Sequence, residues 1–284
     1  LWNCHVHTND IGAAIEVALG LDGRPRQIRV TDLFEEVADE HAHREAEMLR
    51  TASATIDVSG FQLPEVTSAV VAVASGSGLA ALFADLGVQA VVGGGQTLNP
   101  STAELLAAVD RVNSEQVVVL PNNKNIIPVA EQLDALTSKQ VVVVPTRTMP
   151  EALAALVAYD PGAGAEQNGV AMTEAAASVA TGEVTQAVRD SNSDVGPIRE
   201  GDWIGIVKGE GIAAVGGSSH EVSTRLLEVL LTAEAELLTI VVGTDADAHS
   251  TGAILGWLSD EHSDVQVELH EGGQPLYPYL FGVE

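Results

Sequence analysis

Aromatic residues and cysteine are scarce in this chain of 284 residues. Phe, Trp and Tyr make up only 4% of it, whereas hydrophobic residues as a whole make up 46%. Its core must therefore be built from Val, Leu, Ile and Ala, which suits layered α/β folds. The one cysteine, Cys4, excludes an internal disulfide and predicts a reducing, cytoplasmic location. No apolar run reaches the roughly 18 residues that a membrane-spanning helix needs.

Basic residues are the second shortage. The chain has 13 Lys and Arg residues against 40 Asp and Glu residues, a formal net charge of −27. Nucleic acids and anionic membranes both require a basic protein face, so the charge argues against either as a partner. A basic protein partner and a merely solvated acidic surface both remain open. The charge is uneven, because residues 61–159 hold 8 acidic and 4 basic side chains, whereas residues 160–284 hold 21 and 4.

Composition divides the chain into four parts. Residues 1–33 have the pattern of a strand, a helix near 10–20 and a second strand, and they predict the remnant of a preceding (middle) domain. Residues 34–65 are acidic and polar and predict a partly disordered linker. Residues 66–160 predict a parallel α/β lobe, and residues 161–284 predict a mixed α+β lobe. The start of the sequence lacks Met and resembles the middle of a strand, which predicts a piece of a longer protein.

Four hydrophobic runs alternate with four helix-like stretches in the first of these lobes. The runs lie near 68–74, 88–92, 116–120 and 140–145. The helix-like stretches lie near 77–86, 101–112, 123–137 and 149–158. Buried strands joined by crossovers of this length are typical of a parallel sheet with right-handed connections. The predicted fold class is α/β, and the first lobe is predicted to be a parallel sheet with helices on both faces.

A mixed sheet with helices is predicted for the second lobe. An Ala-rich helix near 166–180 comes first. Strands are predicted near 182–189, 202–208, 211–215, 236–242 and 264–270. Helices are predicted near 219–233 and 247–258. Gly209-Glu210-Gly211 suits a hairpin turn between two of these strands. Residues 277–281 are interpreted as a short aromatic tail.

Each strand of the parallel lobe ends in a small, polar loop. The carboxyl ends of parallel strands lie at one edge of a sheet, where folds of this class bind ligands, so the four loops should form one rim. The candidate ligand- or partner-binding residues on this rim are Ser75, Gly76, Ser77, Gly94, Gly95, Gln96, Thr97, Asn99, Ser101, Asn122, Asn123, Lys124, Asn125 and Thr146.

Three interpretations of the rim remain open. Glycine-rich turns and the helix starts behind them can hold an anionic small molecule. The asparagine side chains can instead grip a protein partner. Alternatively, these residues only shape turns and cap helices, with Asn99 or Ser101 as one cap. None of the loops matches a Walker A motif or a full dinucleotide-binding fingerprint.

Two histidines and an aspartate are the other candidates. His5 and His7 are two residues apart, so on a strand both imidazoles project from one face, as zinc ligands can, although a structural zinc site needs about four ligands. Asp245 lies between a predicted strand and a predicted helix and suits either an N-cap or a carboxylate that reaches into the cleft. No pairing of a nucleophile with a base is recognisable, so we predict no catalytic residues.

Four motifs resemble one protein family. They are His5-Val6-His7-Thr8 and the runs 93–102 (GGGQTLNPST), 120–125 (LPNNKN) and 182–190 (GEVTQAVRD). Over the whole chain they resemble the large subunit of bacterial fatty acid kinase, which is related to dihydroxyacetone kinase. The resemblance implies the end of that subunit's middle domain followed by a two-lobed, DegV-like region.

The same resemblance implies a role. In that family ATP and magnesium bind to an N-terminal domain that is absent from this sequence, so this chain is not expected to phosphorylate a substrate alone. Zinc would be held in the intact protein by His5, His7 and a cysteine from earlier in the middle domain. The implied role is to dock an acyl-binding, DegV-like partner subunit or to organise the kinase, and a homodimer is compatible with it. The alternative is a regulatory module that binds an anionic or acyl ligand.

Overall fold

The computed structural model describes residues 11–20, 65–95 and 99–284. The chain forms two compact units, residues 1–37 and 38–284, and each is described by itself. In the first unit, helix α1 (Ile11–Gly20) lies where the sequence predicts a helix. The predicted linker up to residue 64 and both metal candidates, His5 and His7, lie outside the described residues.

Four parallel strands form one sheet of the second unit, in the spatial order β2-β1-β3-β4. They are β1 (Ala69–Ala74), β2 (Ala90–Gly93), β3 (Gln116–Leu120) and β4 (Gln140–Val143). The strand order reverses at β1, which lies between β2 and β3. All four carboxyl ends meet at one edge, so the predicted parallel sheet is confirmed.

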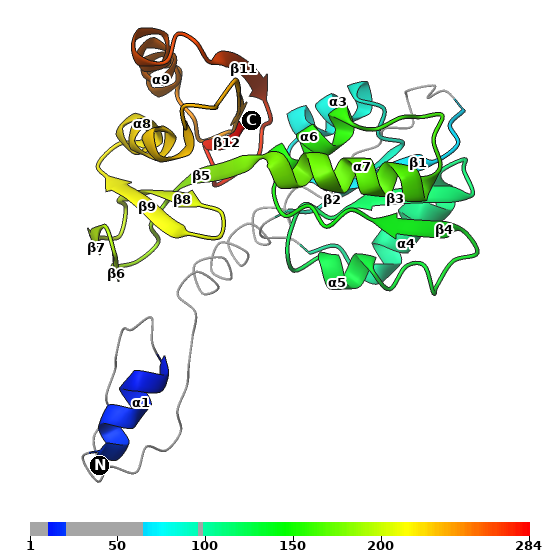
Figure 1. Cartoon of the computed structure of the whole chain (residues 1–284), viewed down its shortest axis with the longest axis horizontal. Coiled ribbons are helices and arrows are strands. Elements are labelled where there is room, and N and C mark those ends of the chain that lie inside the picture. The colour runs from blue at the N-terminus through cyan, green and yellow to red at the C-terminus, as the bar shows by residue number, and fades with distance from the viewer. Residues whose placement is uncertain (1–10, 21–64, 96–98) are drawn as a thin grey trace. The chain divides into compact units, whose positions relative to one another are not determined.

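Helices cover both faces of this sheet (Figure 1). One face packs against α3 (Ser77–Asp85), α6 (Met149–Val157) and α7 (Ala165–Ser178), and the other against α4 (Thr102–Arg111) and the short α5 (Ile127–Ala130). Along β1, Val70 and Ala72 belong to the core on the α3 side, whereas Val71 and Val73 belong to the core on the α4 side. Burial on both faces explains why the strands are continuous apolar runs rather than alternating ones.

The predicted helix at 123–137 is wrong in length, since only α5 is helical there. Pro128 lacks the backbone N–H that a continuing helix needs. The side chain of Asp134 instead accepts a hydrogen bond of 3.0 Å from the backbone of Val141, at the start of β4. The rest of the segment is a series of turns that joins β3 to β4.

A six-stranded mixed sheet forms the core of the rest of the unit, in the order β11-β10-β12-β5-β8-β9. Its strands are β5 (Ala180–Gln186), β8 (Trp203–Val207), β9 (Gly211–Gly216), β10 (Leu237–Val242), β11 (Gln266–Glu271) and β12 (Tyr279–Val283). Only β10 and β11 pair in parallel. Helices α8 (Ser219–Leu230) and α9 (Ala248–Glu261) complete this part.

The predicted aromatic tail is in fact part of a central strand. β12 lies between β10 and β5 and is antiparallel to both, and Tyr279 and Phe281 are fully buried. A small hairpin of β6 (Ser191–Ser193) and β7 (Gly196–Ile198) is a further element that the sequence did not indicate. The mixed sheet itself was predicted correctly.

The sequence predicts a boundary between the two lobes at residue 160, before helix α7. In the structure, however, α7 packs on α6 and on the parallel sheet of the first lobe. We therefore call residues 65–179 the first lobe and residues 180–284 the second lobe. One hydrophobic core continues from α3 and α6 into Val241, Tyr277 and Leu280 of the second lobe. Across the described ranges, no helix combines the length and apolarity needed to cross a membrane.

Candidate functional site

Asn122 and Thr146 form a buried hydrogen-bonded pair at the carboxyl edge of the parallel sheet. Both are at most 1% exposed. The hydroxyl of Thr146 donates to Asn122 Oδ1 at 2.6 Å, and Asn122 Nδ2 donates to the carbonyl of Val73 at 2.7 Å. Asn122 adopts a left-handed backbone with φ of 57°, which asparagine tolerates better than most residues. These bonds connect the ends of β1, β3 and β4.

Asn123 connects the glycine-rich loop to the same edge. Its Nδ2 donates to the carbonyl of Gly95 at 2.9 Å, and its Oδ1 accepts from the backbone N–H of Asn125 at 2.7 Å. The backbone N–H of Gly94 donates to Ala74 at 3.0 Å. The structure therefore brings these rim residues together, and it uses their amides within the chain.

No other described rim candidate contributes a side chain to these hydrogen bonds. Ser101 is the N-cap of α4 and forms a reciprocal capping box with Glu104. Hydrogen bonds from the Ser101 hydroxyl, and then from its backbone N–H, lower the pKa of Glu104. Asn99, Lys124 and Asn125 are exposed. Gln96 and Thr97 lie outside the described residues.

The loop Ser75-Gly76-Ser77-Gly78 contacts the second lobe rather than lying open. The N–H of Leu79, in the first turn of α3, donates to the carbonyl of Gly272 at 2.9 Å. A Cβ atom added to Gly76 would lie 2.5 Å from the same carbonyl, and one added to Gly78 would overlap the carbonyl of Glu271. The backbones of the two lobes thus touch directly, and one donor of this helix start is already used.

The opposing loop, 272–278, is fixed by hydrogen bonds from several directions. Gln274 Nε2 donates to Val241 and Tyr277 carbonyls, each at 3.1 Å. Thr185 donates to the carbonyl of Leu276 at 2.8 Å. Leu276 has a φ of 68°, which is rare for a branched side chain, so these contacts hold it in a strained conformation. We call Gly76–Gly78 together with this loop the junction.

The structure corrects the predicted N-cap of α9. Asp247, not Asp245, caps the helix, with Oδ1 accepting from the backbone of Ser250 at 2.9 Å. Side-chain and backbone hydrogen bonds from Ser250 lower the pKa of Asp247. Asp245 instead accepts a bond of 2.8 Å from the backbone of Leu276. Its carboxylate therefore helps to hold the strained residue of the junction.

A small cavity lies where the rim meets the second lobe. Ser75 and Asn122 line it from the rim, and Gln274 and Tyr277 line it from the junction. Its volume is about 20 Å³, which suits one water molecule. Small-molecule sites usually enclose roughly 300–1,000 Å³, so this cavity is far too small for an acyl chain.

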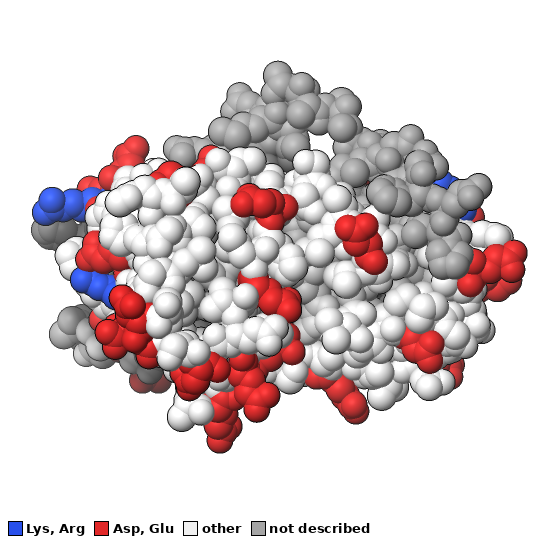
Figure 2. All heavy atoms as spheres, turned by 90° about the horizontal axis from the view of Figure 1, so that it is seen from above, with Lys and Arg blue, Asp and Glu red and all other residues white. Residues whose placement is uncertain are grey.

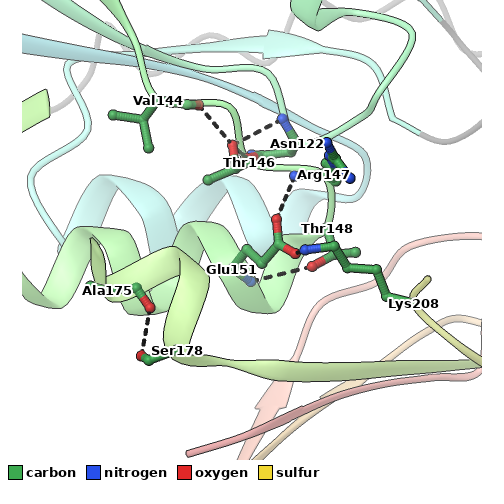
Figure 3. Close-up of polar contacts among 9 residues, drawn as sticks. All are labelled: Asn122, Val144, Thr146, Arg147, Thr148, Glu151, Ala175, Ser178 and Lys208. Carbon is green, nitrogen blue, oxygen red and sulfur yellow. Dashed lines mark hydrogen bonds and ion pairs between the residues drawn. The ribbon is translucent and has the colours of Figure 1, made fainter. Parts of the chain in front are cut away.

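An ion pair joins the lobes beside this cavity. Lys208, in the turn between β8 and β9, pairs with Glu151 of α6, whose side chain is only 2% exposed (Figure 3). The other carboxylate oxygen of Glu151 accepts from the backbone N–H of Arg147 at 2.6 Å. Burial, and then the charge of Arg147, lower the pKa of Lys208. Two cations therefore lie close together around one buried carboxylate.

Among the charged side chains of the surface, acidic ones outnumber basic ones. On the face that Figure 2 shows, they are scattered over both lobes, whereas basic side chains lie only near the margins. Among the described residues, no group of three or more His, Cys, Asp and Glu side chains is placed to hold a metal ion. The surface gives a basic partner more opportunities for contact than an acidic one.

The junction and the ion pair were not found by sequence reasoning. Thr148 and Glu151 do match the Ser/Thr-x-x-Glu pattern of a helix start, and Thr148 is the N-cap of α6. That pattern could have located Glu151, but no local signal pairs it with Lys208 from another lobe. Gln274 likewise has no recognisable motif around it.

Two α/β lobes with a parallel four-stranded sheet, a mixed six-stranded sheet and polar strand-end loops form a DegV-like fold. A DegV family protein from Corynebacterium glutamicum has this fold, with a TM-score of 0.58 and 15% identity over 77% of this chain and 96% of that one. The native dihydroxyacetone kinase of C. freundii gives 0.54 and 15%, over 91% of this chain and 57% of that one. Residues 69–284 match the FakA-like C-terminal family of fatty acid kinase, and the chain belongs to this family.

Curated relatives are longer than this chain. An uncharacterized protein of Staphylococcus haemolyticus is 38% identical over 219 residues, which is 77% of this chain and 40% of that protein. The chain therefore spans less than half of this relative. The family and the fold agree with the resemblance drawn from the sequence motifs.

Proposed function

We propose that this chain is the non-catalytic C-terminal region of the large subunit of an ATP-dependent fatty acid kinase. Its role is to dock the acyl-binding, DegV-like partner subunit. The family match and the DegV-like fold support a kinase accessory region. The proposal assigns ATP and magnesium to a domain outside this chain. Zinc binding by His5 and His7 stays a prediction for the intact protein.

The filled junction is the observation that supports docking of a partner rather than binding of an acyl chain. The backbone N–H of Leu79 donates to the carbonyl of Gly272, and the core is continuous from the first lobe to Tyr277 and Leu280. The cavity that Ser75, Asn122 and Gln274 line has room for one water molecule. This supports a rigid surface for a protein partner rather than a container for an acyl chain.

The buried amides of the rim support the same choice. Asn122, Asn123 and Thr146 direct their hydrogen bonds to neighbouring strand ends, so they shape the rim. Lys124 and Asn125, which are exposed directly beside these buried amides, are then side chains that a partner can reach. Substituting the buried amides would damage the fold, whereas substituting the exposed pair tests contact.

Isothermal titration of this chain with the acyl-loaded DegV-family subunit from the same genome tests the proposal. We expect saturable binding by the wild type and weaker binding by Lys124→Ala/Asn125→Ala. The matched control is Arg111→Ala/Asn113→Ala, which likewise removes one cation and one amide at exposed positions just before β3. These control residues lie toward the amino edge of the sheet, so binding should be unchanged.

Native mass spectrometry of the purified chain tests the regulatory alternative. We expect a mass without bound lipid, because the junction is filled. Detection of one acyl ligand per chain, together with no binding of the partner subunit, would contradict the docking function and support the regulatory alternative.

A further inference from the structure

Arg147 and Lys208 place two positive charges side by side in a strongly acidic molecule. Arg147 follows β4 in the first lobe, and Lys208 lies in the β8–β9 turn of the second. Arg147 is exposed, and the side chain of Lys208 is 34% exposed. Solvent can reach both, and their proximity is unfavourable unless an anion compensates for it.

Glu151 compensates for only one of these charges. One of its oxygens pairs with Lys208, and the other is occupied by the backbone N–H of Arg147. Within the part of the chain that the structure describes, no carboxylate forms an ion pair with the Arg147 guanidinium. The cluster of Arg147, Lys208 and Glu151 therefore carries an excess of one positive charge (Figure 3).

The backbone around Arg147 is rigid. Its N–H is bonded to Glu151, and the residues on either side are Thr146, which is buried and bonded to Asn122, and Thr148, which caps α6. These bonds fix the position of the Arg147 backbone, so no backbone entropy is lost when its side chain binds. Guanidinium binds carboxylate through two parallel N–H···O bonds.

We propose that Arg147, with Lys208 beside it, is the contact for an Asp or Glu side chain of the docked partner subunit. This rests on the docking function proposed above. A partner that binds a molecule of net charge −27 meets acidic surface over most orientations. An acidic partner residue is therefore tolerated at a cationic position and repelled elsewhere, which fixes the orientation of docking.

Charge reversal at Arg147 tests the inference. In titrations with the acyl-loaded DegV-family subunit, Arg147→Glu should raise the Kd by about tenfold at low salt and by less at high salt, because exposed charges are screened. Arg147→Lys, which keeps the charge, should recover most of the loss. The matched control is Arg111→Glu, an exposed arginine of the same lobe on α4, for which less than about a twofold change is expected.

The outcomes separate the two proposals. Every Arg147 variant keeps the backbone N–H that bonds to Glu151, and equal melting temperatures would verify the fold. Equal Kd values for Arg147→Glu and Arg111→Glu would overturn the contact while leaving docking intact. A wild-type chain that shows no binding to the DegV-family subunit would overturn docking, and the contact with it.

Discussion

Lys208 of the second lobe forms an ion pair with the buried carboxylate of Glu151, a residue of the first lobe. Among the described residues, no other side chain forms an ion pair with Glu151. Removing one partner of a buried ion pair leaves the other charge desolvated and uncompensated. Lys208→Met should therefore lower the free energy of unfolding by about 3 kcal/mol, as measured by urea denaturation at pH 7.

The double variant Glu151→Gln/Lys208→Met is the control for that pair. It leaves no bare charge, so it should be more stable than Lys208→Met alone, and the two single effects should not add. Strict additivity would mean that the ion pair contributes no coupling energy across the lobes.

Thr146→Val should destabilise the rim. Valine has nearly the shape of threonine, but it leaves Asn122 Oδ1 without its donor at a buried position, which costs about 2 kcal/mol. Thr146→Ser keeps the hydroxyl and should cost less. Urea unfolding of both variants measures the difference, and a Thr146→Val protein as stable as the wild type would contradict the structural role of this pair.

Gly78→Ala should force the lobes apart at the junction. The added methyl group would overlap the carbonyl of Glu271, and overpacking of this kind costs about 1–3 kcal/mol. Gly252→Ala on α9 meets no atom within 4 Å and should instead stabilise by about 0.5–1 kcal/mol. Thermal unfolding of the two variants gives shifts of opposite sign if the junction is as close as described.

The capping box of α4 should make stability depend on pH. The folded pKa of Glu104 is lowered, so its contribution is fully present above its unfolded pKa of about 4.3 and is lost as pH falls through the folded pKa. Ser101→Ala should cost about 1 kcal/mol at pH 7, and the gap to the wild type should narrow at pH 3.

Ser178→Ala is the control for the cap. The hydroxyl of Ser178 donates to the carbonyl of Ala175 and to no carboxylate, so its effect should not change with pH (Figure 3). A pH-independent cost for Ser101→Ala in urea unfolding would show that Glu104 takes no part in the cap.

Local patterns were sufficient for the strands of the parallel lobe. Uninterrupted valine runs, such as Val117-Val118-Val119, indicate strands buried on both faces, and the positions of β1 to β4 follow from them. Patterns were insufficient where a distant partner decides the structure. Tyr279 and Phe281 lie in a strand because that segment pairs with both β10 and β5. No short window of sequence contains that information.

The residues of the candidate site likewise divide into those whose role the neighbouring sequence predicts and those whose role depends on distant partners. Ser101 was recognised as a candidate cap, because capping depends on neighbours three residues away. The positions of Asn122 and Asn123 at the rim were foreseen, but their burial was not, since it depends on Val73 and Gly95 from other strands. Glu151 and Lys208 come from different lobes, so their pairing had to be seen in three dimensions.

The junction also bears on which substitutions evolution can accept. A Cβ atom on Gly76 or Gly78 would meet main-chain atoms of residues 271–274, and no substitution in that segment removes those atoms. At the glycines themselves there is no intermediate choice, because the smallest side chain already collides. Gly76 and Gly78 should therefore be closed to change, whatever side chains the opposing loop carries.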